Sequence, residues 1–284
     1  MEFRRRLAQG VGVVAVAGAA GGVLSYGAVR DRERHTARCS DRGYPPRPPF
    51  YPFWFKWMLH GHDIPSVRRG FEVYQKVCAN CHSMVELSFR HLINEVYPEK
   101  RVKQIAAQYD VFDGPNQEGE IFVRPGIWTD SFPRPYPNDD AARYANGGAL
   151  PPDLSGIVAG MHGNADYIFS LLTGYRDPPE GMPMNPGQYY NTYTEGGIIA
   201  MPPPLSDGII EYEDGTPATV SQMAKDVAQF LTWATEPATD ERKLIGIKAA
   251  SAAFIGGLFS YTYCRMIYIQ YRTRRIDFVK PVFT

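Results

Sequence analysis

The chain has 284 residues, enough for one large domain or two small ones, and its formal net charge is zero. The charge is unevenly spread: residues 40–240 hold 25 of the 30 acidic and 15 of the 30 basic residues, which leaves 5 acidic and 15 basic residues for the two ends. An acidic middle argues against nucleic-acid binding and suits a basic protein partner, while basic ends beside apolar stretches suit a membrane. Four cysteines in a chain of this size do not form a disulfide framework.

A membrane helix is predicted at the N-terminal end, over residues 1–29. Leu7–Val29 runs for 23 residues without a charge, which is long enough to cross a bilayer. The three arginines at positions 4–6 precede it, and the positive-inside rule places them on the matrix or cytoplasmic side. A basic start followed by an apolar run is also typical of a sorting segment that is cut off, so this alternative stays open.

A linker is predicted over residues 30–59. It is charged at first and then proline-rich, and it ends in a dense aromatic cluster over residues 51–58. Such a cluster is typical of a membrane-interface belt, but it could equally form the lid of a protein core.

The motif at residues 78–82, Cys-Ala-Asn-Cys-His, has the C-x-x-C-H pattern by which a c-type haem is attached. Each thiol adds across one vinyl group of the porphyrin, so Cys78 and Cys81 would form two thioether bonds. His82 then reaches the iron from a backbone that is already tethered to the ring. The motif therefore predicts one covalent haem c.

Two other interpretations of this motif are weaker. A structural zinc site would need two further ligands at similar spacing, and the other cysteines, Cys39 and Cys264, are isolated and distant. A redox dithiol of the thioredoxin kind would need a βαβ context, which the sequence does not show.

A helix is predicted to start at Pro65-Ser66, with Ser66 as its N-cap. Val67, Phe71, Tyr74 and Cys78 follow at helical spacing, so the apolar face of this helix carries the first haem cysteine.

The remainder of the predicted haem domain, which spans residues 60–243, is richer in loops. Residues 85–110 are moderately helical, and residues 111–220 contain many glycines and prolines with one short helical candidate at 166–174. The clearest late helix covers 221–235, with Ser221 as its cap and Pro237 after its end.

The second predicted membrane helix covers residues 244–271. Only Lys248 and Arg265 interrupt it, one near each end, where long basic side chains can reach the interface. The basic tail over 272–284 places the C-terminus on the matrix or cytoplasmic side, so that residues 30–243 lie on the opposite side.

The sixth iron ligand is expected to be a thioether, which raises the reduction potential relative to a second histidine. Met201 is favoured because Pro202, Pro203 and Pro204 follow it, and a rigid extended run would hold a ligand still. The other candidates in the loop-rich region are Met161, Met182 and Met184.

Several long segments, in this order, resemble the cytochrome c1 family, the c-type haem subunits of the mitochondrial-type bc1 complex (ubiquinol–cytochrome c reductase, complex III). The resemblance covers roughly residues 60–284. The matching segments are 66–84 around the haem motif, Arg134-Pro-Tyr-Pro-Asn138, 146–155 (Asn-Gly-Gly-Ala-Leu-Pro-Pro-Asp-Leu-Ser), 167–175 (Tyr-Ile-Phe-Ser-Leu-Leu-Thr-Gly-Tyr), Ile199-Ala-Met-Pro-Pro203 and 214–227.

The resemblance implies a mainly α fold: a cytochrome c-like haem domain with long loop insertions and a C-terminal transmembrane helix, to which the sequence adds the N-terminal helix. It implies the axial pair His82 and Met201, and Asn146, Pro152 and Tyr167 as further haem contacts. Met161 stands where the family often has an arginine near a haem propionate, so a propionate partner is missing or comes from elsewhere.

The resemblance also implies a function, in which the haem relays single electrons from the Rieske iron–sulfur protein to soluble cytochrome c. Cytochrome b and other complex III subunits would be further partners in a dimeric complex of the mitochondrial inner membrane. The haem domain would face the intermembrane space and the C-terminus the matrix. The alternatives are a membrane-anchored c-type cytochrome subunit of another respiratory oxidase or reductase, and a haem sensor or peroxidase-like protein with an open sixth site.

Overall fold

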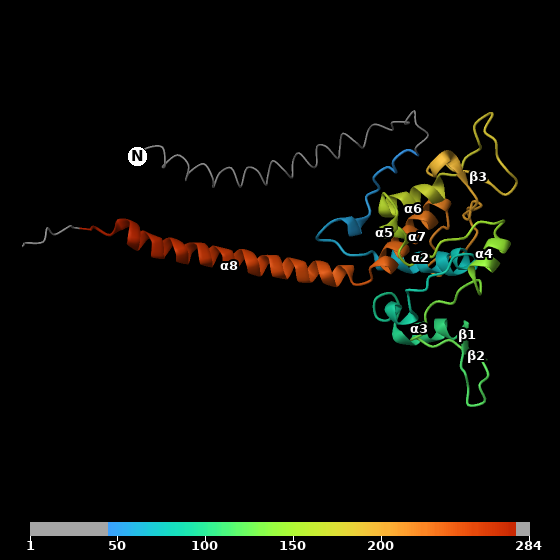
Figure 1. The fold of residues 1–284 in the computed structure, drawn as a ribbon, viewed down its shortest axis with the longest axis horizontal. Helices are drawn as coiled ribbons and strands as arrows, with labels where there is room; N and C mark the ends of the chain where they lie inside the picture. Colours follow the sequence, from blue (N-terminus) through green and yellow to red (C-terminus); the bar gives the residue numbers. More distant parts are fainter. Residues whose placement is uncertain (1–44, 277–284) are drawn as a thin grey trace, which may run out of the picture.

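Two crossing helices, α2 (Ile64–Lys76) and α7 (Val220–Thr235), form the centre of the fold in the computed structural model, which describes residues 45–276. The long helix α8 (Thr239–Thr273) projects away from this centre (Figure 1). The predicted N-terminal helix over 1–29 lies outside the described residues, as does most of the predicted tail over 272–284.

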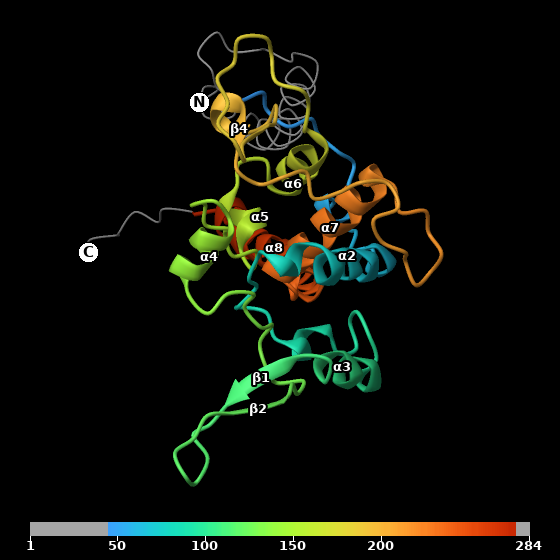
Figure 2. The same ribbon diagram turned by 90° about the vertical axis from the view of Figure 1, so that its right-hand side faces the viewer.

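Shorter helices and turns surround the crossing. They are α3 (Glu99–Ala106), α4 (Asp139–Ala145), α5 (Ile157–Gly160) and α6 (Asn164–Thr173), with 3-10 turns η1 (Trp54–Lys56), η2 (Cys78–Asn80), η3 (Phe89–Leu92) and η4 (Glu195–Gly197). The two small antiparallel sheets pair β1 (Asp110–Asp113) with β2 (Phe122–Pro125), and β3 (Tyr189–Tyr190) with β4 (Ile198–Ile199). The β1–β2 hairpin and the β3–β4 loop protrude on opposite sides of the α2–α7 crossing (Figure 2). This architecture confirms the predicted mainly helical fold with long loops.

The predicted N-caps of the two central helices are wrong, by three residues for α2, whose N-cap is Asp63, and by two residues for α7. Helix α2 begins at Ile64, before Ser66, because Pro65 fits the first helical turn, where no backbone N–H is needed for the helix. Ser66 is buried inside the helix and its hydroxyl accepts a hydrogen bond from Arg69. Helix α7 is capped by Thr219, whose side chain accepts from the backbone N–H of Gln222, so Ser221 lies in the first turn.

The predicted helical character of residues 85–110 is found only in part, since η3 and α3 occupy this region together with irregular backbone and the start of β1. The strands β1 to β4 were not expected from the sequence. The β1–β2 hairpin is held by Arg124, which pairs with Asp113 across the two strands and with Asp130 at 2.8 Å.

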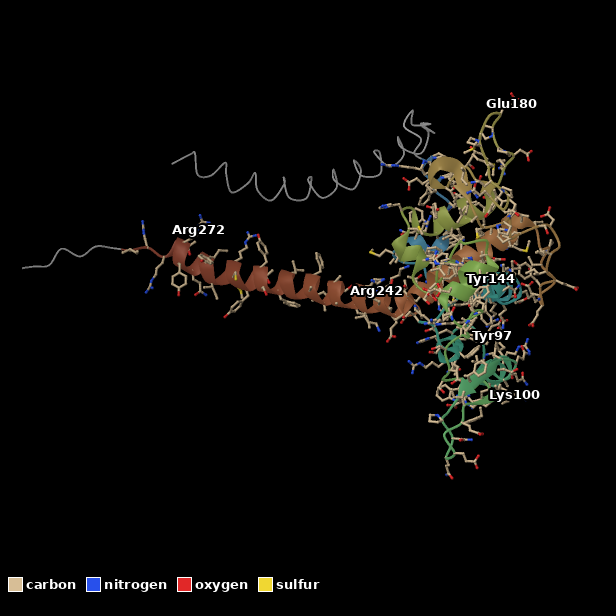
Figure 3. All side chains as sticks on the ribbon, turned by 45° about the vertical axis from the view of Figure 1, so that its right-hand side comes forward. Tyr97, Lys100, Tyr144, Glu180, Arg242 and Arg272 are labelled. Carbon is tan, nitrogen blue, oxygen red and sulfur yellow. The ribbon has the colours of Figure 1, made fainter. Side chains whose placement is uncertain are left out.

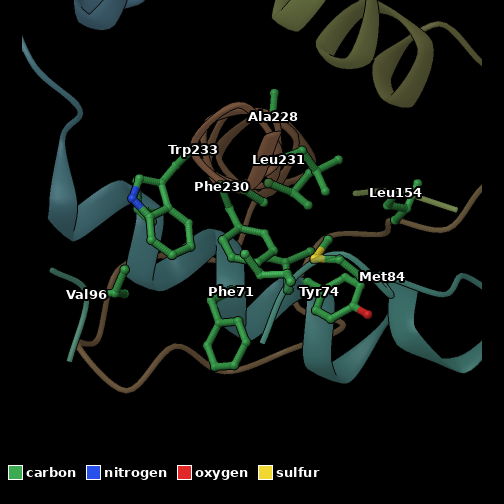
Figure 4. Close-up of a cluster of buried hydrophobic side chains, with 14 of the residues drawn as sticks. Phe71, Tyr74, Met84, Val96, Leu154, Ala228, Phe230, Leu231 and Trp233 are labelled. Carbon is green, nitrogen blue, oxygen red and sulfur yellow. The ribbon is translucent and has the colours of Figure 1, made fainter. Parts of the chain in front are cut away.

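Aromatic side chains fill the interface between α2 and α7. The ring centroid of Phe230 lies 5.5 Å from that of Phe71 and 5.7 Å from that of Tyr74, and all three side chains are buried (Figure 4). Trp233 stacks on Phe230 and donates its indole N–H to Glu95 at 3.0 Å. Burying each such ring contributes about 1.5–3 kcal/mol, which makes this interface the main hydrophobic core.

A glycine permits the close approach of the two central helices. A Cβ atom at Gly70 would lie 2.1 Å from the backbone carbonyl oxygen of Asp226 and 2.6 Å from Cβ of Phe230. The Asp226 carboxylate is fully buried beside this contact and is bound by Arg69 at 2.8 Å, with Gln222 at 2.8 Å and Tyr212 at 3.2 Å as further donors. A buried carboxylate with this set of partners is satisfied and fixes the two helices in register.

Helix α8 is long and apolar enough to cross a membrane, as predicted for the C-terminal region. Its 35 residues extend for about 50 Å, more than the roughly 30 Å of a bilayer core. None of its residues is buried against the rest of the described chain. Arg242 marks its end near the helical centre and Arg272 its far end (Figure 3).

We expect Gly70→Ala to weaken the α2–α7 contact. The new methyl group meets backbone atoms, which cannot rotate away, so the helices must separate, at a cost of about 1–3 kcal/mol or more. Thermal unfolding followed by circular dichroism measures this loss as a lower Tm. Gly246→Ala in α8 is the control, since no atom lies within 4 Å of its Cβ position. Equal Tm values for the two variants would contradict the role of Gly70.

Candidate haem site

The C-x-x-C-H motif forms a compact turn directly after α2. The helix ends at Lys76, and Cys78 begins the 3-10 turn η2. The backbone N–H groups of Cys81 and His82 both donate to the carbonyl oxygen of Cys78, at 3.1 and 2.9 Å. The predicted helix thus stops before the motif, but the tight turn still holds both cysteines and the histidine on one short loop.

The two cysteine thiols are free in the described structure and differ in exposure. Cys78 is half-buried against the hydrophobic core, whereas Cys81 is exposed. Burial, with a smaller contribution from neighbouring Cys81, raises the pKa of the Cys78 thiol to about 12. One side of the turn therefore faces the core and the other faces outward.

A second segment, residues 152–155, is hydrogen-bonded to residues 82–86, which are the haem histidine and the four residues after it. We call these two paired segments the clip. The backbone N–H of Leu154 donates to the carbonyl of Ser83 at 2.9 Å. The Asp153 carboxylate accepts from the Ser83 hydroxyl at 2.7 Å and from the backbone N–H of Val85 at 3.1 Å. Ser155 in turn accepts from the backbone N–H of Glu86 at 3.0 Å.

The clip also fixes the histidine. Nδ1 of His82 lies 2.8 Å from the carbonyl oxygen of Pro152, an acceptor, so Nδ1 carries the proton and donates it. Nε2 is then the nitrogen with a lone pair to offer to a metal. Burial lowers the pKa of His82, which favours the neutral imidazole needed for ligation. Pro152 was predicted as a haem contact; in the structure its carbonyl orients the histidine.

The donor set fits a haem better than zinc. Within residues 45–276 there is no group of three or more His, Cys, Asp or Glu side chains placed to hold a metal ion. Cys264 lies on α8, outside the helical centre. Two thiols that can bond a porphyrin and one oriented imidazole are the parts that this turn supplies.

Met201 lies in the loop after β4, at the start of the proline run, and is half-buried. The hydroxyl of Tyr175 donates to the backbone carbonyl of Met201 at 3.1 Å. Tyr175 follows the end of α6, and burial raises the pKa of its hydroxyl, so it stays protonated as a donor. This contact ties the methionine loop to α6.

The three rival methionines lie elsewhere in the loops. Met161 is the C-cap of α5 and is exposed. Met182 and Met184 belong to the long loop before β3, where the methyl group of Met182 lies near Gly197.

Asn146 and Tyr167, the other predicted haem contacts, have structural surroundings of their own. Asn146 is the C-cap of α4, and its amide donates to the Ala142 carbonyl at 2.7 Å and to the Tyr136 hydroxyl at 3.1 Å. Tyr167 is half-buried in α6 and packs against the core. Within residues 45–276, no hydrogen bond joins either side chain to the haem motif.

Sequence reasoning missed Asp153, Ser83 and Ser155 as site residues, and it missed the contact of Tyr175. They act by hydrogen bonds between segments about 70 residues apart, which leave no periodic signal in the sequence. Their position in the segments that resemble the family could have drawn attention to them. Asp153 follows the Pro-Pro pair in segment 146–155, and Tyr175 ends segment 167–175.

We expect Asp153→Asn to weaken the clip by about 1 kcal/mol, since a partly exposed charged acceptor is replaced by a neutral one. Burial alone would raise the pKa of Asp153, but hydrogen bonds from Ser155 and Ser83 outweigh it and hold the pKa below its ordinary value. The carboxylate therefore stabilises the fold above about pH 4 and ceases to do so as the pH falls through its lowered pKa.

Unfolding measured between pH 7 and pH 2 tests this effect. The variant should be less stable than the wild type at pH 7, and the difference should shrink in acid. Asp177→Asn, at an exposed position, is the control. A difference that is constant with pH would contradict the role of the charge.

Comparison with known proteins adds independent information to this geometry. The profile of the Cytochrome C1 family matches residues 53–271. "Cytochrome c1-2, heme protein, mitochondrial" of Solanum tuberosum is 48% identical over 257 residues, which cover 90% of this chain and 95% of that protein. "Cytochrome c1, heme protein" of Euglena gracilis is 48% identical over 239 residues (83% and 97%), and the mitochondrial cytochrome c1 heme protein of Saccharomyces cerevisiae is 46% identical over 232 residues (80% and 75%). The chain therefore belongs to the cytochrome c1 family.

Proposed function

We propose that the chain is the electron-transfer subunit of a ubiquinol–cytochrome c reductase and holds one covalent haem c. Cys78 and Cys81 would form the thioether bonds, and His82 and Met201 would bind the iron. The observation that carries this proposal is the C-x-x-C-H turn whose histidine donates Nδ1–H to the Pro152 carbonyl, which leaves Nε2 for the iron. Membership of the cytochrome c1 family supports it.

The chain's part in the reaction would be to bind the haem, to orient its histidine ligand and to set its reduction potential. When bound, the haem supplies a couple that gains and loses one electron. His82 is held in one tautomer by the clip, so the imidazole does not reorient when the charge of the site changes. As an iron ligand, the thioether of Met201 would favour the reduced state and raise the potential, and Tyr175 holds the loop that carries it. Asn146 and Tyr167 would line the same site.

The partners follow from the same proposal. A Rieske iron–sulfur protein would donate the electron and soluble cytochrome c would accept it, with cytochrome b and other complex III subunits in a dimeric complex. A groove beside η2, next to the haem turn, is lined by Asn80, Ile209 and Glu211. Lys76 and Glu213 also line it, and Glu213 pairs with Arg101 at 2.6 Å. The two glutamates of this groove support a basic acceptor. Complementary charge speeds the encounter of such transient partners.

The proposed location is the mitochondrial inner membrane. Helix α8 would cross it, the haem domain over 60–243 would face the intermembrane space, and the basic tail over 272–284 would lie in the matrix. The lysine and arginine residues after α8 support this orientation through the positive-inside rule.

We expect Met201→Leu to keep the covalent haem but lose the methionine ligand. The reduced-minus-oxidised spectrum of the purified complex should lose its low-spin features, carbon monoxide should bind, and the potential should fall, because leucine offers no sulfur to Fe(II). Haem staining of the denatured chain should be unchanged. Met182→Leu and Met184→Leu are the matched controls and should behave as wild type. A normal spectrum in Met201→Leu would assign the ligand to another residue, and no haem on the denatured wild-type chain would overturn the proposed function.

The reduction of cytochrome c should slow as ionic strength rises, because salt screens the attraction between acidic and basic surfaces. Stopped-flow rates with Glu211→Gln/Glu213→Gln should be severalfold lower at low salt and should depend less on salt. Glu118→Gln, on the exposed loop between β1 and β2, is the control. A wild-type rate that is flat with ionic strength would argue against electrostatic docking at this groove.

A further inference from the structure

The aromatic cluster before α2 has two faces with different surroundings. We call residues 51–62 the collar. Its inner face is packed: Phe53 is buried and stacks on Phe55 with ring centroids 5.3 Å apart, and Tyr51 lies 4.4 Å from Phe169 of α6. Its outer face carries four large apolar side chains that are 58–75% exposed, namely Trp54, Trp57, Met58 and Leu59. Both predicted roles of the cluster, core lid and surface belt, therefore have residues to support them.

The collar is bonded to the base of α8. Nζ of Lys243 donates to the backbone carbonyl of Phe55 at 2.6 Å and to that of His60 at 2.8 Å. The carboxylate of Asp240 accepts from the backbone N–H of His62 at 3.0 Å. Contact with Asp240 is so close that a Cβ atom at Gly61 would lie 2.5 Å from its carboxylate oxygen. These bonds fix the position of the outer face along the axis of α8.

That position is the level at which α8 becomes apolar. Lys243 is the last charged residue before Leu244, where the predicted membrane stretch begins. From Leu244 to Tyr271 the helix rises by about 40 Å, which spans a hydrocarbon core of roughly 30 Å and reaches into the interfacial layer at each end. A collar bonded at Lys243 therefore lies at one interface.

The chemistry of the outer face fits this level. Tryptophan concentrates at the membrane–water interface, where its apolar ring and its N–H group are both satisfied. Methionine and leucine beside it can enter the acyl boundary, where removing their apolar surface from water is favourable. Exposed clusters of this kind mark an interaction surface, and its continuity with the membrane helix identifies the bilayer as the partner.

We infer that the outer face of the collar rests in the interfacial layer of the bilayer, on the side of the helical domain, and acts as a second membrane contact beside α8. A single helix would leave the domain free to tilt about its base. With the collar in the lipid surface, the domain is held at two points, and the height of the haem turn above the membrane is fixed. This inference rests on α8 crossing the bilayer and is independent of the identity of the haem ligands.

Photocrosslinking in the assembled complex tests the lipid contact. The photoreactive residue p-benzoylphenylalanine replaces Trp54 or Trp57 in the full-length chain, and the complex is placed in nanodiscs of phosphatidylcholine and cardiolipin. Trp128, an exposed tryptophan after β2, is the matched control position. Mass spectrometry should find lipid adducts on the collar peptide for both collar positions and none at position 128.

Other products of the reaction would overturn the inference. A crosslink from position 57 to another subunit in place of lipid would make the outer face a protein interface, and an unmodified collar would place it in water. The haem spectrum of each sample shows whether the complex is assembled, so a failure of the haem proposal is seen separately.

A charge in the collar gives an independent test. Trp57→Glu should lower lipid crosslinking from position 54 at least severalfold, because a carboxylate is repelled from the acyl boundary. Trp128→Glu should leave it unchanged. Equal crosslinking in the two variants would contradict the insertion of the outer face.

Discussion

The contact between α2 and α7 at Gly70 is the constraint on which the rest of this structure depends. Only a residue without a Cβ allows the Asp226 carbonyl to approach at this point, and the aromatic rings of Phe71 and Phe230 fill the space beside it. The ends of the two helices then determine three other features. Helix α2 begins after the collar and ends at the haem turn, while α7 ends just before α8. One helix crossing therefore sets the haem motif, the collar and the membrane helix relative to one another.

The haem turn needs a second constraint, because a short loop after a helix end has little order of its own. The clip supplies it through bonds from residues 152–155 to residues 82–86. One of its acceptors also determines the protonation of the ligand, because the Pro152 carbonyl accepts from Nδ1 of His82 and leaves Nε2 for a metal. The same bonds that order the loop thus prepare its histidine for ligation.

Elements that are stabilised by many residues in a repeating pattern could be predicted from the sequence, whereas single contacts between distant residues could not. Helices α2, α7 and α8 were predicted because burial of one face, or of a whole span in lipid, imposes a pattern on many residues. The caps of α2 and α7 were misplaced for different reasons. Pro65 fits the first turn of α2, so this helix begins before Ser66, whereas at α7 Thr219 competes with Ser221 for the same backbone donors. The clip and the hairpin held by Arg124 were missed because single polar contacts between distant segments impose no such pattern. The haem motif was recognised because covalent chemistry requires a fixed spacing.

The collar shows why a composition signal alone left two interpretations open. Aromatic residues are favoured both in cores and at membrane interfaces, so the sequence of residues 51–58 fits both. The structure shows which residues fit each interpretation. The 3-10 turn η1 directs Phe53 and Phe55 toward the core and leaves Trp54 and Trp57 exposed. Lys243 fixes the position of these exposed side chains along α8, because it joins the collar backbone to the helix at the last residue before the apolar span.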